Sequence, residues 1–177
     1  MRRQLAVLGG LVALSLVAGP AFAANPATIS VTVTIQSLSV SATGPIAFGV
    51  VVAASQTVSG AASTVTNDGN VTETLSLSLT NPATWTAVQA APAAAEQYAL
   101  LAQFNSAAPT GASFTYADYS LGTAPVTSSV VKFAGDQTGL SILAAGTRSL
   151  WFRFNAPTST TVTTQQTITV TLTASAG

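Results

Sequence analysis

The sequence predicts an all-β protein built as one antiparallel β-sandwich of about eight or nine strands. Hydrophobic residues alternate with serine and threonine along most of the chain, which is the period of a half-buried strand. No segment shows the period of an amphipathic helix. Glycine, proline and asparagine stand between the alternating segments, where a sandwich needs its corners.

The first strand is expected at residues 28–35, where four aliphatic residues alternate with serine and threonine. The alternation shifts by one residue at Gln36-Ser37, which indicates a bulge or a crossing between sheets, because such a slip would otherwise turn the core face to solvent. Leu38 and Val40 follow, and a short strand begins at Ile46. Later strands are expected at residues 62–67, 71–80, 85–88, 98–105, 130–134, 140–143, 148–156 and 166–174.

The core is expected to hold the apolar residues that share one parity within each strand. These are Leu75, Leu77, Leu79, Leu150, Phe152, Phe154, Ile168, Val170 and Leu172.

Residues 67–70, Asn-Asp-Gly-Asn, divide two alternating segments and are the clearest corner of the chain. A three-residue hairpin loop at 68–70 keeps Val65 and the leucines of 71–80 on one face, and asparagine tolerates the left-handed conformation that ends such loops. Calcium binding is the alternative. Calcium takes six to eight oxygens, usually from several carboxylates, and here Asp68 stands alone. We expect a structural turn, and the same for the loop around Asp136.

The first residues have the order of a secretory signal peptide. A basic start, Met1-Arg2-Arg3-Gln4, precedes an apolar run, and Ala21-Phe22-Ala23 is a small-residue cleavage site. The two arginines also raise twin-arginine export, although the rest of that motif is missing. The chain is therefore expected to divide into a signal peptide, 1–23, and one β-sandwich domain, 24–177, without a transmembrane segment.

The charge of the mature chain excludes several partners. Removal of residues 1–23 leaves three basic and five acidic side chains, a net charge of −2. Three scattered cations cannot make the several phosphate contacts that nucleic-acid binding needs, nor hold the protein on anionic lipid. A surface with so few charges carries little repulsion between copies, so self-association is expected.

Catalytic, cofactor and metal sites are not expected. The chain has no histidine, which removes the commonest general base and the commonest metal ligand. No Gly-x-Ser-x-Gly elbow is present to expose a serine nucleophile, and the five acids are scattered. We expect a protein that is not an enzyme.

Trp151 and Arg153 are the candidate ligand platform. In the strand at 148–156 they share the face opposite Leu150, Phe152 and Phe154. On the surface they could stack on a sugar, together with Trp85, Tyr116 and Tyr119; the alternative is that they pack under a neighbouring loop.

The segment 28–35 is the candidate intermolecular strand. Ile29, Val31, Val33 and Ile35 give it an apolar face, and it contains neither lysine nor proline, which usually protect edge strands. It could add to the open edge of another subunit. The alternative is an ordinary first strand that pairs within its own chain.

Three stretches resemble known secreted families. Residues 143–160, LAAGTRSLWFRFNAPTST, resemble bacterial immunoglobulin-like and fibronectin-like modules. Residues 28–51, with the turn Ile46-Ala47-Phe48-Gly49, are similar to the opening of spore coat U and pilin-like subunits, and residues 165–177 are similar to their last strand. The resemblance implies an immunoglobulin-like sandwich, although the cysteines typical of those families are missing.

The sequence thus leads us to expect a secreted or cell-surface structural protein without a cofactor, a subunit of a filament, a coat or an extracellular matrix. The alternative is a β-sandwich module that binds a polysaccharide or another surface.

We expect export to remove the segment that ends at Ala23, because the basic, apolar and small-residue regions follow in the order that signal peptidase recognises. Intact-mass analysis of the secreted protein measures this directly and should give a chain that begins at Ala24. A mature protein that still carries Met1 would contradict the expectation.

Overall fold

The computed structural model describes residues 27–115, 117–118 and 121–177. The expected signal peptide lies outside the described residues. By its internal contacts the chain divides into two units, residues 1–34 and residues 35–177. The second unit holds every strand of the described residues and is described first.

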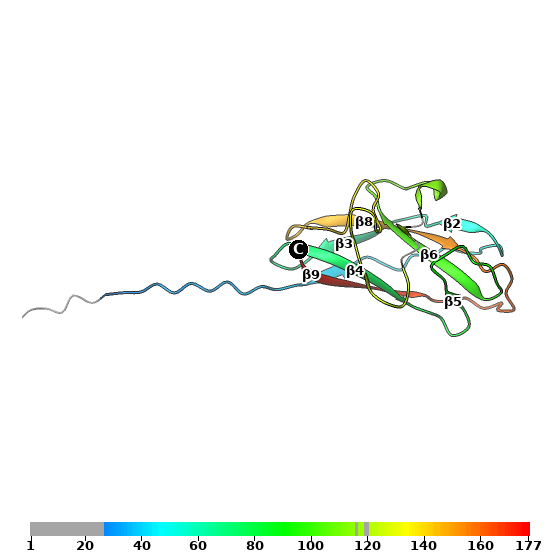
Figure 1. Ribbon diagram of the computed structural model, residues 1–177, viewed down its shortest axis with the longest axis horizontal. Helices are drawn as coiled ribbons and strands as arrows, with labels where there is room; N and C mark the ends of the chain where they lie inside the picture. Colours follow the sequence, from blue (N-terminus) through cyan, green and yellow to red (C-terminus); the bar gives the residue numbers. More distant parts are fainter. Residues whose placement is uncertain (1–26, 116, 119–120) are drawn as a thin grey trace, which may run out of the picture. The chain divides into compact units, whose positions relative to one another are not determined.

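Residues 35–177 fold into two β-sheets that pack face to face (Figure 1). The first sheet has the order β1 (Val40–Ala42), β3 (Ser63–Asn67), β8 (Thr147–Asn155), β6 (Gln97–Phe104) and β5 (Thr86–Ala87), and β2 (Gln56–Val58) also pairs with β8. The second sheet has the order β7 (Val126–Thr127), β4 (Glu73–Thr80) and β9 (Thr169–Ala176). All pairs are antiparallel except β5 with β6. The predicted all-β sandwich is confirmed.

The core lies between β4 on one side and β8 and β6 on the other. Six predicted core residues are buried, namely Leu75, Leu77, Leu79, Leu150, Phe152 and Phe154. The three predicted from the last strand, Ile168, Val170 and Leu172, pack against the same cluster but stay partly exposed. The parity of the alternating segments therefore identifies the inward face correctly, and the degree of burial differs between strands.

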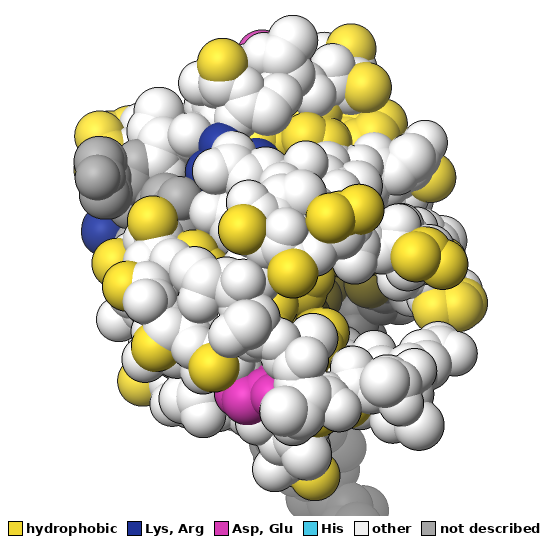
Figure 2. All heavy atoms as spheres, turned by 90° about the vertical axis from the view of Figure 1, so that its right-hand side faces the viewer, with side chains coloured by type: hydrophobic (Ala, Val, Ile, Leu, Met, Phe, Trp, Pro, Cys, Tyr) yellow, Lys and Arg dark blue, Asp and Glu magenta, His cyan; other side chains and the backbone are white. Residues whose placement is uncertain are grey.

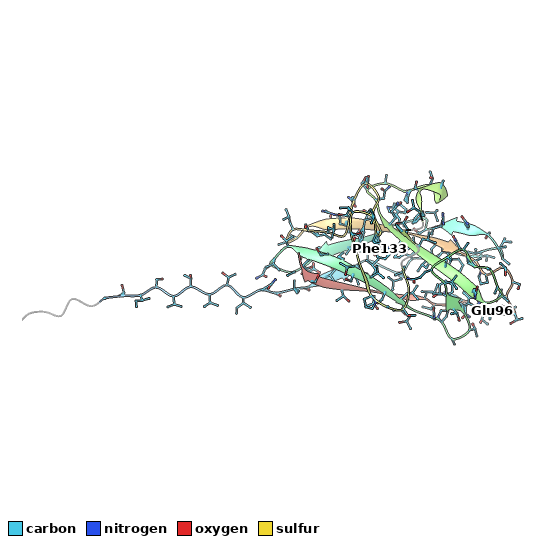
Figure 3. The ribbon with its side chains drawn as sticks, in the orientation of Figure 1. Glu96 and Phe133 are labelled. Carbon is cyan, nitrogen blue, oxygen red and sulfur yellow. The ribbon has the colours of Figure 1, made fainter. Side chains whose placement is uncertain are left out.

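Two predicted strands, 130–134 and 140–143, are wrong. Phe133, labelled in Figure 3, has φ +58°, and Ser141 has φ +47°. A strand cannot continue through a residue in the left-handed region. Each segment is instead joined to the sheets by one isolated bridge, from Ala134 to Phe104 and from Ile142 to Glu73. Phe133 and Ile142 are nevertheless buried.

The beginning of the chain also differs from the prediction. No strand forms at 28–35 or at Ile46, and the strand expected around Leu38 and Val40 is β1, which begins at Val40. The remaining predicted strands are present, with their ends displaced by at most three residues.

The corner at 67–70 joins two sheets and is not a hairpin loop. β3 pairs with β1 and β8, whereas β4 pairs with β7 and β9. Val65 and the leucines of β4 still face the same interior, as predicted, because the two strands lie on opposite sides of the core. The parity of a sequence is the same for a hairpin and for a crossing between sheets, which is why the predicted pairing of β3 with β4 is wrong.

We expect Leu77→Ala to lower the free energy of unfolding by about 2–5 kcal/mol, because truncation of a fully buried leucine leaves a cavity. Leu172, directly opposite on β9, is the matched control. Its truncation should cost clearly less, since the side chain is already partly exposed. Denaturant titration under dilute, monomeric conditions measures both losses. Equal losses would show that β9 is covered as fully as β4.

Candidate functional site

Residues 28–35, here called the arm, form no strand among the described residues. Their pairing, within their own chain or with a second copy, stays a prediction. Ile29, Val31, Val33 and Ile35 are 88, 80, 81 and 78% exposed. Figure 3 shows the side chains of the extended segment alternating between its two sides. The arm thus presents four aliphatic side chains in a row with strand spacing.

In the second unit, β9 is an edge strand. It pairs with β4 over its whole length, from Thr169 opposite Thr80 to Ala176 opposite Glu73, and no strand among the described residues pairs with its other side. Each residue of an edge strand that does not bond its neighbour directs its amide and carbonyl groups outward. β9 contains neither charge nor proline along its eight residues. It is therefore an open edge without the usual protection.

The apolar side chains near this edge are incompletely covered. Leu77 is fully buried, yet Leu172, its direct neighbour on β9, is partly exposed. Leu172 is less covered than Leu77 because β4 has a neighbouring strand on each side, whereas β9 has a neighbouring strand on one side alone. β1, the edge strand of the other sheet, lies against β9. The partly exposed core residues on these two edges and the segment after β1 are Val40, Ile46, Phe48, Val51, Ile168, Val170, Leu172 and Ala174.

The corner at 67–70 is built from hydrogen bonds within the chain. Asn67 is buried, its Nδ2 donates to the carbonyls of Val71 and Ile142, and its Oδ1 accepts from the amide of Gly69. A Cβ on Gly69 would lie 2.5 Å from Glu73 Oε1, so only glycine fits there. Among the described residues no group of three acidic, histidine or cysteine side chains could hold a metal. The geometry is that of a structural turn.

Glu73 lies inward, beneath this corner. Its side chain is fully buried, Oε1 accepts from the amide of Ser39 at 2.7 Å, and Oε2 has no hydrogen-bond partner in the described part of the chain. The sequence leaves open whether Glu73 faces inward or outward. Its contact with the amide of Ser39 ties the corner to the segment that leads into β1.

Asp136 also belongs to a structural turn. Its carboxylate accepts from the hydroxyl and the amide of Ser106, and its own amide donates to Asn105 Oδ1 at 2.8 Å. The side-chain and main-chain bonds from Ser106 hold the pKa of Asp136 below its usual range. The predicted reading of this loop as a turn agrees with these contacts.

The pair Trp151 and Arg153 packs under a neighbouring segment. Trp151 is half-buried against a small cluster around Ala99, Leu101 and Phe114, and its Nε1 donates to the carbonyl of Asn105 at 2.9 Å. Arg153 is buried, at 6% exposure. The structure thus places the pair between the outer face of the first sheet and the segment that contains Phe114.

The guanidinium of Arg153 is engaged on three sides. Nε donates to Asn155 Oδ1 at 3.1 Å, Nη1 donates to the carbonyl of Gly111, and the group lies 5.5 Å from the centre of the Phe114 ring. Arg153 is therefore not exposed in the way that the predicted ligand platform requires. Nothing in the sequence of 148–156 indicates that a loop covers this face, since the covering residues come from a separate stretch.

The other aromatic residues of the proposed platform are not brought to this pair. Trp85 stacks on Phe154 with a centroid distance of 5.9 Å and contacts Tyr98, on the core side of the sheet. Tyr116 and Tyr119 lie outside the described residues.

In the described part of the chain, no helix has the length and apolar character to cross a membrane. No protein family, no curated protein and no solved structure matches the chain.

We expect Arg153→Ala to lower the free energy of unfolding by about 2–3 kcal/mol, because it leaves Asn155 Oδ1 and the carbonyl of Gly111 without their charged partner. Arg148→Ala serves as the control on the same strand, since Arg148 is only half-buried and donates to two main-chain carbonyls. Its cost should be below about 1 kcal/mol. Thermal or denaturant unfolding compares the two, and an equal cost would contradict the buried role of Arg153.

Proposed function

We propose that this protein is an exported, non-enzymatic structural subunit that self-associates by adding its arm to the open edge of β9 in a second copy. The observation that carries the proposal is the arm itself, which exposes four aliphatic side chains at strand spacing and forms no strand among the described residues. Such a row is unfavourable in water and becomes favourable once a sheet edge covers it.

The arm and the edge match in length and pattern. The arm has eight residues and β9 has eight, each about 27 Å when extended. In both, hydroxyl-bearing residues alternate with apolar ones, so a paired arm would direct its aliphatic side chains to the core and its serine and threonine side chains to solvent. The partly exposed residues beside β9 supply the apolar surface that the arm would cover.

The free energies involved indicate that addition of the arm to β9 needs both apolar burial and main-chain hydrogen bonds. Full burial of four Val or Ile side chains contributes about 6–12 kcal/mol, at roughly 1.5–3 kcal/mol each. The loss of translational and rotational freedom on association costs about 4–15 kcal/mol. The apolar term alone is therefore marginal. Strand addition also pairs outward main-chain groups, which gives the association its further stabilisation and its register.

The surface of the domain supports association between like molecules. Charged residues are 6% of the chain, and Figure 2 shows few charged side chains on the face of the domain that it presents. Copies of the domain therefore repel one another weakly. Neither the arm nor β9 contains the lysine or proline that blocks strand addition in other proteins.

Export and the lack of catalysis rest on the sequence. The order of residues 1–23 supports a secreted or cell-surface location. The absence of histidine and cysteine supports a role without enzymatic chemistry. A subunit of a filament, a coat or an extracellular matrix fits a small exported domain that adds to copies of itself. Polysaccharide binding has less support, because the polar groups of Trp151 and Arg153 are engaged within the chain.

The parity of the arm gives a sharp test. Val31→Asp places a charge on the face that the edge of β9 would bury, and an unpaired buried charge is strongly unfavourable. We expect it to weaken self-association at least tenfold, about 1.4 kcal/mol. Thr32→Asp, the matched control, places the same charge one residue further on, where it faces solvent in the paired arm. Its association should stay near that of the wild type.

Sedimentation velocity over a concentration series measures both variants beside the unmodified mature protein. A wild-type protein that stays monomeric at the highest concentrations would overturn the proposal. Equal weakening by the two substitutions would show that charge, and not the apolar face of the arm, controls association.

A further inference from the structure

The hydrogen-bond ladder between β1 and β3 continues past the ends of both strands. Val40 lies opposite Asn67 in the register of the two strands. Beyond them, the amide of Asp68 donates to the carbonyl of Ser39 at 2.8 Å, and the amide of Asn70 donates to the carbonyl of Ser37 at 3.1 Å. These contacts keep the antiparallel register of the strands, so residues 37–39 remain in line with β1.

At these last two positions of the ladder, side chains of the corner replace main-chain carbonyl groups as hydrogen-bond acceptors. In a regular ladder, the amides of Ser37 and Ser39 would donate to carbonyl groups directly opposite. Here the amide of Ser39 donates to Glu73 Oε1 at 2.7 Å, and the amide of Ser37 donates to Asn70 Oδ1 at 2.8 Å. Asn70 Nδ2 also donates to the carbonyl of Ile35 at 2.8 Å. The corner thus holds the chain as far as the last residue of the arm.

This arrangement opposes a return of the arm to the β9 edge of its own chain. β9 ends beside the corner, since Ala176 lies opposite Glu73, and β1 begins there. To lie along its own β9, the arm would have to turn back at residues 36–39, directly before β1. Four residues are an ordinary length for a connecting loop. It would, however, break the bonds that hold Ser37 and Ser39 in line with β1.

We infer that Asn70 and Glu73 are positioning residues that keep residues 35–39 in line with β1 and thereby reserve the arm for a second copy. The inference rests on the proposed function. Self-insertion has no entropic cost of association and would win if the loop could form freely, because the tethered arm is at a high effective concentration. The corner removes this competitor by fixing the one segment that must bend.

Disulfide trapping separates the two destinations of the arm, since the chain has no native cysteine. Thr32→Cys and Thr171→Cys are both on exposed, polar positions of the arm and of β9. A protein that carries both is oxidised at low concentration, and non-reducing mass analysis gives the share of disulfides within a chain and between chains. With the natural corner, we expect bonds between chains to dominate. With Asn70→Ala, the share within a chain should rise several-fold.

Asn105→Ala is the matched control. It also removes two side-chain hydrogen bonds from an asparagine in a loop, at a place unconnected with residues 35–39, and should leave the shares unchanged. Hydrogen exchange verifies the intended loosening, which should accelerate exchange at the amide of Ser37 and leave that of Leu75 unchanged. If Leu75 also exchanges faster, Asn70→Ser replaces Asn70→Ala.

A mixture of the two single-cysteine proteins distinguishes the two failures. No disulfide between Thr32→Cys and Thr171→Cys chains would overturn the proposed association. A mixed disulfide together with unchanged shares in Asn70→Ala would leave the association standing and overturn the role of the corner. The role of the corner would also be overturned if the double-cysteine protein with its natural corner formed its disulfides mainly within the chain.

Discussion

The packing of β4 against the inner face of β8 is the interaction on which the rest of the structure depends. Three leucines of β4 meet Leu150, Phe152 and Phe154, and every other strand is hydrogen-bonded directly or through one neighbour to this pair of strands. The chain has no cysteine to add a covalent constraint. Because stability rests on this one layer of contacts, the side of β9 that faces away from β4 can remain unpaired without loss of the fold.

The inward face of each strand could be predicted from the sequence because its physical basis is local. Successive side chains of a strand point to opposite faces, so Leu75, Leu77 and Leu79 must share a face wherever the strand lies. The same rule places Trp151 and Arg153 together on the other face of β8. The arm follows this rule as well, and its four aliphatic residues are recognisable as one face without knowledge of what covers them.

Pairing and cover could not be predicted, because they depend on residues far away in the chain. The sequence around Asn67 is equally compatible with a hairpin and with a crossing between sheets, and the choice is made by β1, β8 and β9. The cover over Arg153 comes from the segment around Phe114, and Glu73 becomes a ladder partner only once Ser39 lies beside it. The left-handed conformations of Phe133 and Ser141 are similarly imposed by their surroundings, since neither residue type favours them.

The arm and the edge of β9 are two different surfaces, and this has a consequence for the size of any assembly of the proposed kind. A contact between two unlike surfaces leaves one of each unused at the ends, so growth is linear and does not close on itself unless the rotation between copies happens to form a ring. A copy without an arm would accept a neighbour and offer none, and a copy with a blocked β9 would do the reverse. Either one ends a chain, so a small fraction of such copies would set the average length of the polymer without altering the strength of any single contact.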